Sequence, residues 1–174
     1  MLSLKMNDAA VGALGVLAGL GAAEPAGGLA PGLRGRAARG IVRRGEVLVW
    51  ADSPGNAEGG LGFVDLTGWE CADSSFHLER VVPVDVAVAD GEPFISEEGQ
   101  RVLLAHGVAF GLEFSRLVYG LRPSVPVRCI LAANETCATF RFHQIRRGEH
   151  WNVPGLDGYR MEKVIVIDIE PAAR

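Results

Sequence analysis

Ser96–Leu121 reads SEEGQRVLLAHGVAFGLEFSRLVYGL, and this stretch decides the fold. The Ser96 hydroxyl can cap the amino end of a helix, and Glu97 and Glu98 place carboxylates in the first turn, opposite the positive end of the helix dipole. Residues that can form one buried face recur at steps of three and four: Leu103, Gly107, Phe110, Phe114, Leu117 and Leu121. We therefore predict one long helix over about 96–121, which ends at Gly120 and before Pro123.

Strand patterns follow this helix. Val127–Ala133 and Thr136–Arg146 are rich in β-branched and aromatic residues, and Asn134-Glu135 between them favours a turn. These segments predict an antiparallel pair. Tyr159–Glu170 predicts a last strand, and because its first half is apolar at successive positions, we expect it to lie inside the sheet.

Shorter strand patterns precede the helix. Glu46–Trp50, Leu61–Leu66 and His77–Val88 each predict a strand, and a glycine-rich loop covers 55–62. Together with the C-terminal elements they predict an α+β fold, in which an antiparallel, possibly mixed, sheet is packed by the long helix at about 96–121.

The N-terminal region is rich in alanine and glycine. Asn7 or Asp8 can cap a helix that runs to about Ala23, and Leu33–Arg44 predicts a short second helix after a Pro/Gly-rich connection. We expect one domain over 1–174, with a helical N-terminal region at 1–45 and an α+β body at 46–174, because this length is typical of a single domain.

The apolar run Ala9–Ala23 is shorter than the roughly 20 residues that a membrane-spanning helix needs. A signal peptide favours a positive start, and Asp8 here offsets Lys5. Cys71, Cys129 and Cys137 match neither a Cys-x-x-Cys pair nor a disulfide framework, so we expect free thiols in a reducing compartment. These features favour a cytoplasmic protein without a membrane partner.

Charge is divided unevenly along the chain. The formal net charge is −4, and residues 49–174 hold eleven Lys/Arg against eighteen Asp/Glu. An acidic body disfavours nucleic acid as a partner. Five arginines lie within Arg34–Arg44 and could contact phosphates, but a solvated helix face or an intramolecular match for the acidic body explains them as well.

The chain carries no complete motif for catalysis, metal or nucleotide binding. The glycines of 55–62 lack the Gly-Lys-Ser/Thr ending of a phosphate loop, and Gly-x-Ser-x-Gly is absent. His143 and His150 are seven residues apart, with no third metal ligand at a recognised spacing. We therefore expect no cofactor and no metal, and a binding role rather than an enzymatic one.

Functional side chains are densest at the end of the strand Thr136–Arg146 and in the loop after it. They are Arg141, His143, Arg146, Glu149, His150 and Trp151. If Phe140 and Phe142 enter the core, alternation places Arg141 and His143 on the opposite strand face, where we expect them to point outward. The cluster can be a solvated surface, a partner-binding surface or, through a His–carboxylate pair, an acid–base site.

The segment ATFRFHQIRRGEHW (138–151), followed by LDGY (156–159) and VIVID (164–168), resembles the ending of bacterial polymorphic-toxin immunity proteins. The resemblance implies a non-catalytic protein that neutralises a cognate toxin by covering its active site. Arg141, His143, Glu149, His150 and Trp151 would then belong to the contact patch, since Trp and Arg are favoured interface anchors.

Two other functions remain open. The chain could be a small ligand-binding protein or enzyme with a pocket between the long helix and the sheet, lined by residues such as Trp69, His77, Glu79 and His143. It could also be a structural subunit of a larger assembly, if the N-terminal helix buries its apolar stripe against another chain.

Overall fold

The computed structural model describes residues 1–15 and 25–171. The long helix α4 spans Glu97–Gly120, and the Ser96 side chain accepts a hydrogen bond from the Gly99 amide at 3.1 Å. Its buried residues include Leu103, Phe110 and Phe114. The predicted helix, its cap and its buried face are confirmed.

The main sheet is antiparallel throughout and has the strand order β1-β9-β7-β8-β4. Its three long strands are β7 (Val127–Ala133), β8 (Ala138–Gln144) and β9 (Lys163–Ile169). β9 pairs on both sides, as predicted. The turn between β7 and β8 is longer than the predicted Asn134-Glu135 turn, because the Asn134 carboxamide accepts the amides of Thr136 and Cys137.

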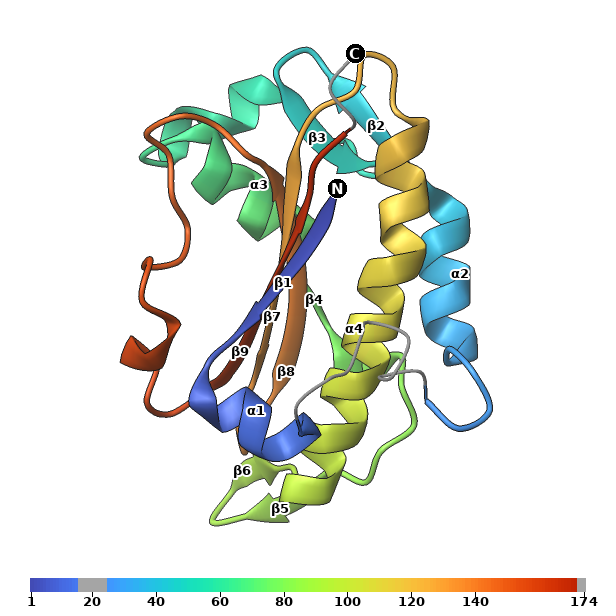
Figure 1. Ribbon diagram of the computed structural model, residues 1–174, viewed down its shortest axis with the longest axis vertical. Helices are drawn as coiled ribbons and strands as arrows, with labels where there is room; N and C mark the ends of the chain where they lie inside the picture. The colour runs from blue at the N-terminus through green and yellow to red at the C-terminus, as the bar shows by residue number, and fades with distance from the viewer. Residues whose placement is uncertain (16–24, 172–174) are drawn as a thin grey trace.

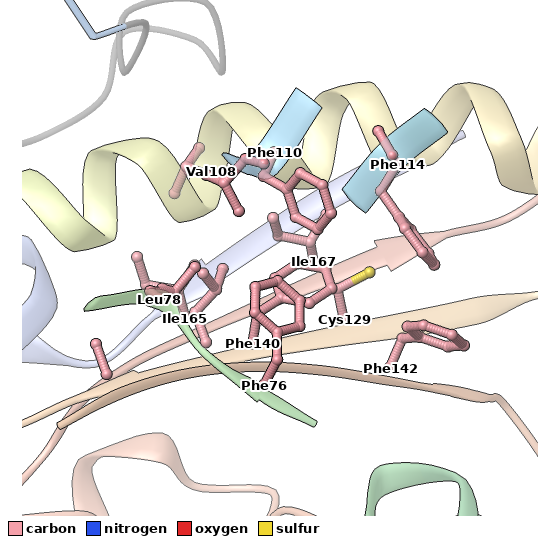
Figure 2. Packing of buried hydrophobic residues seen from close by; sticks show 14 of the residues in the cluster. Phe76, Leu78, Val108, Phe110, Phe114, Cys129, Phe140, Phe142, Ile165 and Ile167 are labelled. Carbon is pink, nitrogen blue, oxygen red and sulfur yellow. The ribbon is translucent and has the colours of Figure 1, made fainter. Parts of the chain in front are cut away.

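α4 covers one face of this sheet, and the core lies between them (Figure 1). Figure 2 shows Phe110 and Phe114 of α4 reaching toward Phe140 and Phe142 of β8. The ring centroids of Phe110 and Phe140 are 4.8 Å apart, and those of Phe114 and Phe142 are 4.7 Å apart. Aromatic rings therefore pack in the space between α4 and β8, where the ligand-binding alternative places its pocket.

Two glycines let α4 approach the sheet closely. A Cβ at Gly107 would lie 2.0 Å from Leu131 Cδ2, and one at Gly111 would lie 2.5 Å from Ile167 Cδ1. Because they are four residues apart, both face the sheet from the same side of the helix. Gly107, which was predicted on the buried face of the helix, thus lies against the sheet.

The N-terminal region contains strands as well as helices. β1 (Leu2–Met6) pairs with β9, and α1 (Asp8–Leu14) is capped by Asn7, whose side chain accepts from the Ala10 amide. α1 ends at Leu14, before its cap residue Gly15, and positions 16–23 of the helix predicted to Ala23 lie outside the described residues. The predicted helix Leu33–Arg44 is only partly right: α2 spans Pro31–Arg39, and Gly40 then turns the chain into β2.

The middle of the chain departs most from the predictions. β2 (Ile41–Arg44) and β3 (Val47–Trp50) form a separate hairpin, as do β5 (Ala87–Ala89) and β6 (Glu92–Phe94). The predicted strand Leu61–Leu66 is wrong. A 3-10 turn covers Ala57–Gly62, and Asp65 then caps the helix α3 (Leu66–Ser74) by accepting the Gly68 amide.

The predicted strand His77–Val88 is replaced by shorter elements. They are β4 (Phe76–His77), a 3-10 turn at Leu78–Arg80, and β5. β4 pairs with Phe140 and Thr139 of β8 and forms an edge of the main sheet.

α4 is long and apolar enough to cross a membrane by length and composition, with a mean hydropathy of 1.3 over its most apolar window. Half of that window is buried inside the fold. This is the pattern of a helix that packs on a sheet in the core of an α+β fold.

The glycines of α2 provide a matched stability test. A Cβ at Gly35 would meet nothing within 4 Å, whereas one at Gly32 would lie 2.6 Å from the backbone oxygen of Val81. Because alanine favours a helix over glycine, Gly35→Ala should stabilise the protein by about 0.5–1 kcal/mol. Gly32→Ala should destabilise it. Urea unfolding measures both, and a loss of stability in Gly35→Ala would contradict the expectation.

Candidate partner-binding surface

The candidate surface is the face of the main sheet that points away from α4, here called the outer face. Alternation places Ile130, Arg141, Val164 and their same-face neighbours there, while Phe140 and Phe142 enter the core. The connection 145–162 between β8 and β9, here called the cover segment, lies on this side of the sheet (Figure 1). Its Leu156 and Tyr159 pack against Ile130, Val164 and Val166.

Arg141 and Trp151 are brought together on the outer face. The guanidinium carbon of Arg141 lies 5.2 Å from the centre of the Trp151 ring. Trp151 is 42% exposed, while Trp50 and Trp69 are 3% and 7% exposed. The stacking therefore holds a cation and an accessible aromatic ring in one arrangement, as cation–π contacts do.

Arg146 has a different position. Its guanidinium bonds both carboxylate oxygens of Glu70 at 2.7 and 2.8 Å and also donates to the Glu46 carbonyl at 2.7 Å. The Glu70 side chain is fully buried and the Arg146 side chain is 12% exposed. Arg146 therefore joins the turn between β2 and β3, α3 and the end of β8, and little of it faces solvent.

Glu149 also has an internal contact. Its carboxylate accepts the backbone amide of Thr67 at 3.0 Å and lies 3.9 Å from Arg146. Because Thr67 is in the first turn of α3, the carboxylate stabilises the amino end of that helix. About a quarter of the Glu149 side chain stays exposed, at 26%.

We expected His143 to point outward into solvent, but this prediction is wrong, since His143 is only 2% exposed. Its Nδ1 lies 2.8 Å from the Gln144 carbonyl, so Nδ1 carries the proton, and Nε2 is buried with no hydrogen-bond partner among the described residues. Burial, together with the positive charges of Arg128 and Arg146, lowers the pKa of His143 to about 4, against the opposing effects of the hydrogen bond with Gln144 and the negative Asp168. His143 is therefore neutral at pH 7.

His150 is exposed and lines a hollow of about 230 Å³. Lys5, Arg128 and Asn152 share this hollow. The predicted site residues thus separate into an accessible part (Arg141, His150 and Trp151, with the partly exposed Glu149) and a buried part (His143 and Arg146).

Sequence reasoning missed two carboxylates of this region. Asp168 bonds Arg128 at 2.6 and 2.8 Å across β9 and β7, and Arg128 in turn donates to Asn152 of the cover segment. A charged residue inside the apolar strand VIVIDI was the available signal for Asp168. Glu70 left no such signal, since its partners lie in distant segments.

A larger cavity of about 350 Å³ adjoins the Arg141–Trp151 pair. Ile130, Ala132 and Val164 supply its apolar floor. Its polar lining comes from the turn between β7 and β8, from β8 and from the cover segment: Asn134, Thr139, Arg141, Asn152, Tyr159 and Glu162.

The three cysteines are free, as predicted. Burial raises the pKa of the Cys71 thiol to about 12 and that of Cys129 well above its usual value. Both thiols therefore stay protonated at neutral pH and are poor nucleophiles. Cys137 is half-buried and lines the cavity beside Asn134.

The pocket residues expected for a ligand-binding protein do not converge. Trp69 packs with Val47 and Val49 in a separate cluster, and His77 pairs with Glu79 at 2.8 Å near the β4 edge. The Glu79 carboxylate also accepts the Ala138 amide at 3.0 Å, where β8 begins. These side chains support the sheet edge.

Comparisons with known proteins place the chain in a family. No curated protein and no solved structure matches it. The model of one protein family matches residues 58–173, which include α3, α4, β7, β8, the cover segment and β9. The match covers well over half of the chain and all the residues of the candidate surface described above except Lys5. The chain therefore belongs to the uncharacterized protein PM0498 family.

Proposed function

We propose that this protein is a non-enzymatic binding protein of the bacterial cytoplasm, which neutralises a cognate toxin by binding it directly. The observation that carries the proposal is the exposed Trp151 ring stacked on the Arg141 guanidinium. Trp and Arg dominate the binding energy of many interfaces. Because the two side chains already hold each other, binding would cost less side-chain entropy than ordering two free ones.

The surroundings of this pair support the proposal. The cover segment also exposes Val153 (51%) and Met161 (84%), while His150 and Glu149 supply polar groups nearby. Apolar anchors with a polar rim are the usual anatomy of an interface. The net charge of −4 favours a basic partner, because opposite charge accelerates encounter.

The direct test is coexpression with the product of the adjacent gene. We expect the product to inhibit growth when expressed alone, and growth to recover when this protein is present. The two proteins should copurify at a fixed ratio. Neighbouring genes that encode metabolic enzymes, and no stoichiometric partner in a pull-down from the native host, would contradict the proposal.

Trp151 should be the most sensitive position on the surface. We expect Trp151→Ala to weaken binding of the coexpressed partner by more than about tenfold, because an interface anchor contributes roughly 2 kcal/mol or more. Leu61→Ala is a matched control, since Leu61 is 92% exposed and lies outside the cover segment. Calorimetric titration measures both variants. Equal affinity of Trp151→Ala and the unmodified protein would exclude this surface.

A further inference from the structure

Three arginines near the outer face differ in their partners. Arg128 forms two hydrogen bonds with Asp168, and Arg146 forms two with Glu70. Arg141 has no carboxylate within ion-pair distance among the described residues, and its guanidinium donates one hydrogen bond, to Thr139 Oγ1 at 3.1 Å. A guanidinium carries several N–H donors in one plane, so most of those of Arg141 remain available.

Arg141 also lines the cavity of about 350 Å³. This volume lies at the lower end of the range for small-molecule sites, which is about 300–1,000 Å³. The stacked Trp151 covers one face of the guanidinium, so a ligand would meet its N–H edge. Ile130, Ala132 and Val164 would contact the apolar part of such a ligand.

The polar side chains that line the cavity further restrict the class of ligand that fits it. The Tyr159 hydroxyl accepts the Val153 amide at 3.1 Å, which leaves its own proton free to donate. Glu162 lines the same cavity, and its negative charge repels any carboxylate near it, so a single carboxylate paired with Arg141 is favoured over a ligand that carries two. One guanidinium fork, one hydroxyl donor and an apolar floor fit a single planar carboxylate on an apolar body.

We propose that this cavity binds a small organic monocarboxylate, whose carboxylate pairs with Arg141 and whose apolar part lies on Ile130, Ala132 and Val164. The proposed ligand is a free small molecule. Its binding is measured on the isolated protein without any partner and is therefore independent of the proposed function.

The indole signal of Trp151 can report binding at this cavity. Among the three tryptophans it alone is substantially exposed, and the Trp50 indole donates to the Ser74 carbonyl inside the core. In a ¹H–¹⁵N spectrum we expect the Trp151 indole signal to shift and saturate with benzoate or hexanoate, while the Trp50 signal stays in place. Benzamide and hexanamide, which have nearly the same shape without the charge, should give at least tenfold weaker binding.

Variants separate the site from general effects. Arg141→Ala should abolish the saturable shift, and Arg141→Lys should retain only part of the affinity because a lysine lacks the planar fork. Arg116→Ala is the matched control, since Arg116 lies on α4 with its side chain 78% exposed, and we expect it to bind as the unmodified protein does.

Three results would overturn the inference. One is the lack of a saturable shift with either acid at about 10 mM, which exceeds a Kd of about 1 mM tenfold. Another is equal binding of an acid and its amide. The third is retained benzoate binding in Arg141→Ala with an unchanged spectrum elsewhere.

Discussion

Glu70→Ala should destabilise the protein by about 3–5 kcal/mol, because the change leaves the buried Arg146 cation without its counterion. The Glu70 side chain is fully buried and bonds Arg146 with both oxygens at 2.7 and 2.8 Å. The same oxygens accept the backbone amides of Leu48 at 2.6 Å and Gln144 at 2.7 Å. The variant would therefore also leave two backbone donors without an acceptor.

The position of Glu70 explains why its loss should spread through the fold. β4 pairs with only Phe140 and Thr139 of β8, so the rest of that strand edge needs other acceptors. Ser74 Oγ accepts the Phe142 amide at 2.9 Å, and Glu70 accepts the Gln144 amide. Side chains of α3 thus replace a missing neighbouring strand, and Glu70 also ties β3 to that edge.

Urea unfolding measures the loss, and a double-mutant cycle assigns it. Arg146→Ala should cost a similar amount, and the double variant should cost less than the sum, because each single change leaves a buried charge that the other removes. Glu113→Ala, which breaks an exposed pair with Arg116, should cost less than about 1 kcal/mol. Additive losses within about 0.5 kcal/mol would show that Glu70 and Arg146 act independently.

Local sequence signals were sufficient for α4, β7, β8 and β9. The cap at Ser96, the three- and four-residue steps and the alternating strands are short-range patterns that survive in the fold. β1 was not predicted, because its five residues form a strand by pairing with β9, at the other end of the chain. The strand predicted over Leu61–Leu66 is wrong because of a local signal: the cap at Asp65 starts a helix and overrides the short apolar pattern.

The candidate surface was predictable only in part. Alternation correctly placed Arg141 and His143 on the face opposite Phe140 and Phe142. Whether either is accessible depends on the cover segment, which has no periodicity and crosses the outer face by an irregular path. His143 is buried, whereas Arg141 meets Trp151 at the cavity.

The buried His143 predicts a loss of stability in acid. Burial lowers the pKa of His143 to about 4 in the folded protein, from an ordinary value near 6.5 in the unfolded chain. Between these values the unfolded chain binds more protons, so stability is fully present above about pH 6.5 and falls as the pH drops toward 4. A difference of about 2.5 units at 1.36 kcal/mol each gives a loss of about 3 kcal/mol.

His143→Asn should flatten this dependence. An asparagine amide can donate to the Gln144 carbonyl as Nδ1 does, but it does not titrate. His106→Gln is the matched control: desolvation also lowers the pKa of His106, but that side chain is only partly buried, so most of the acid dependence should remain. Urea midpoints between pH 7.5 and 4.5 measure the slope, with carboxylate titration common to all three proteins. If NMR titration finds the pKa of His143 near 6.5 in the folded state, burial does not depress it and the predicted loss of stability in acid is wrong.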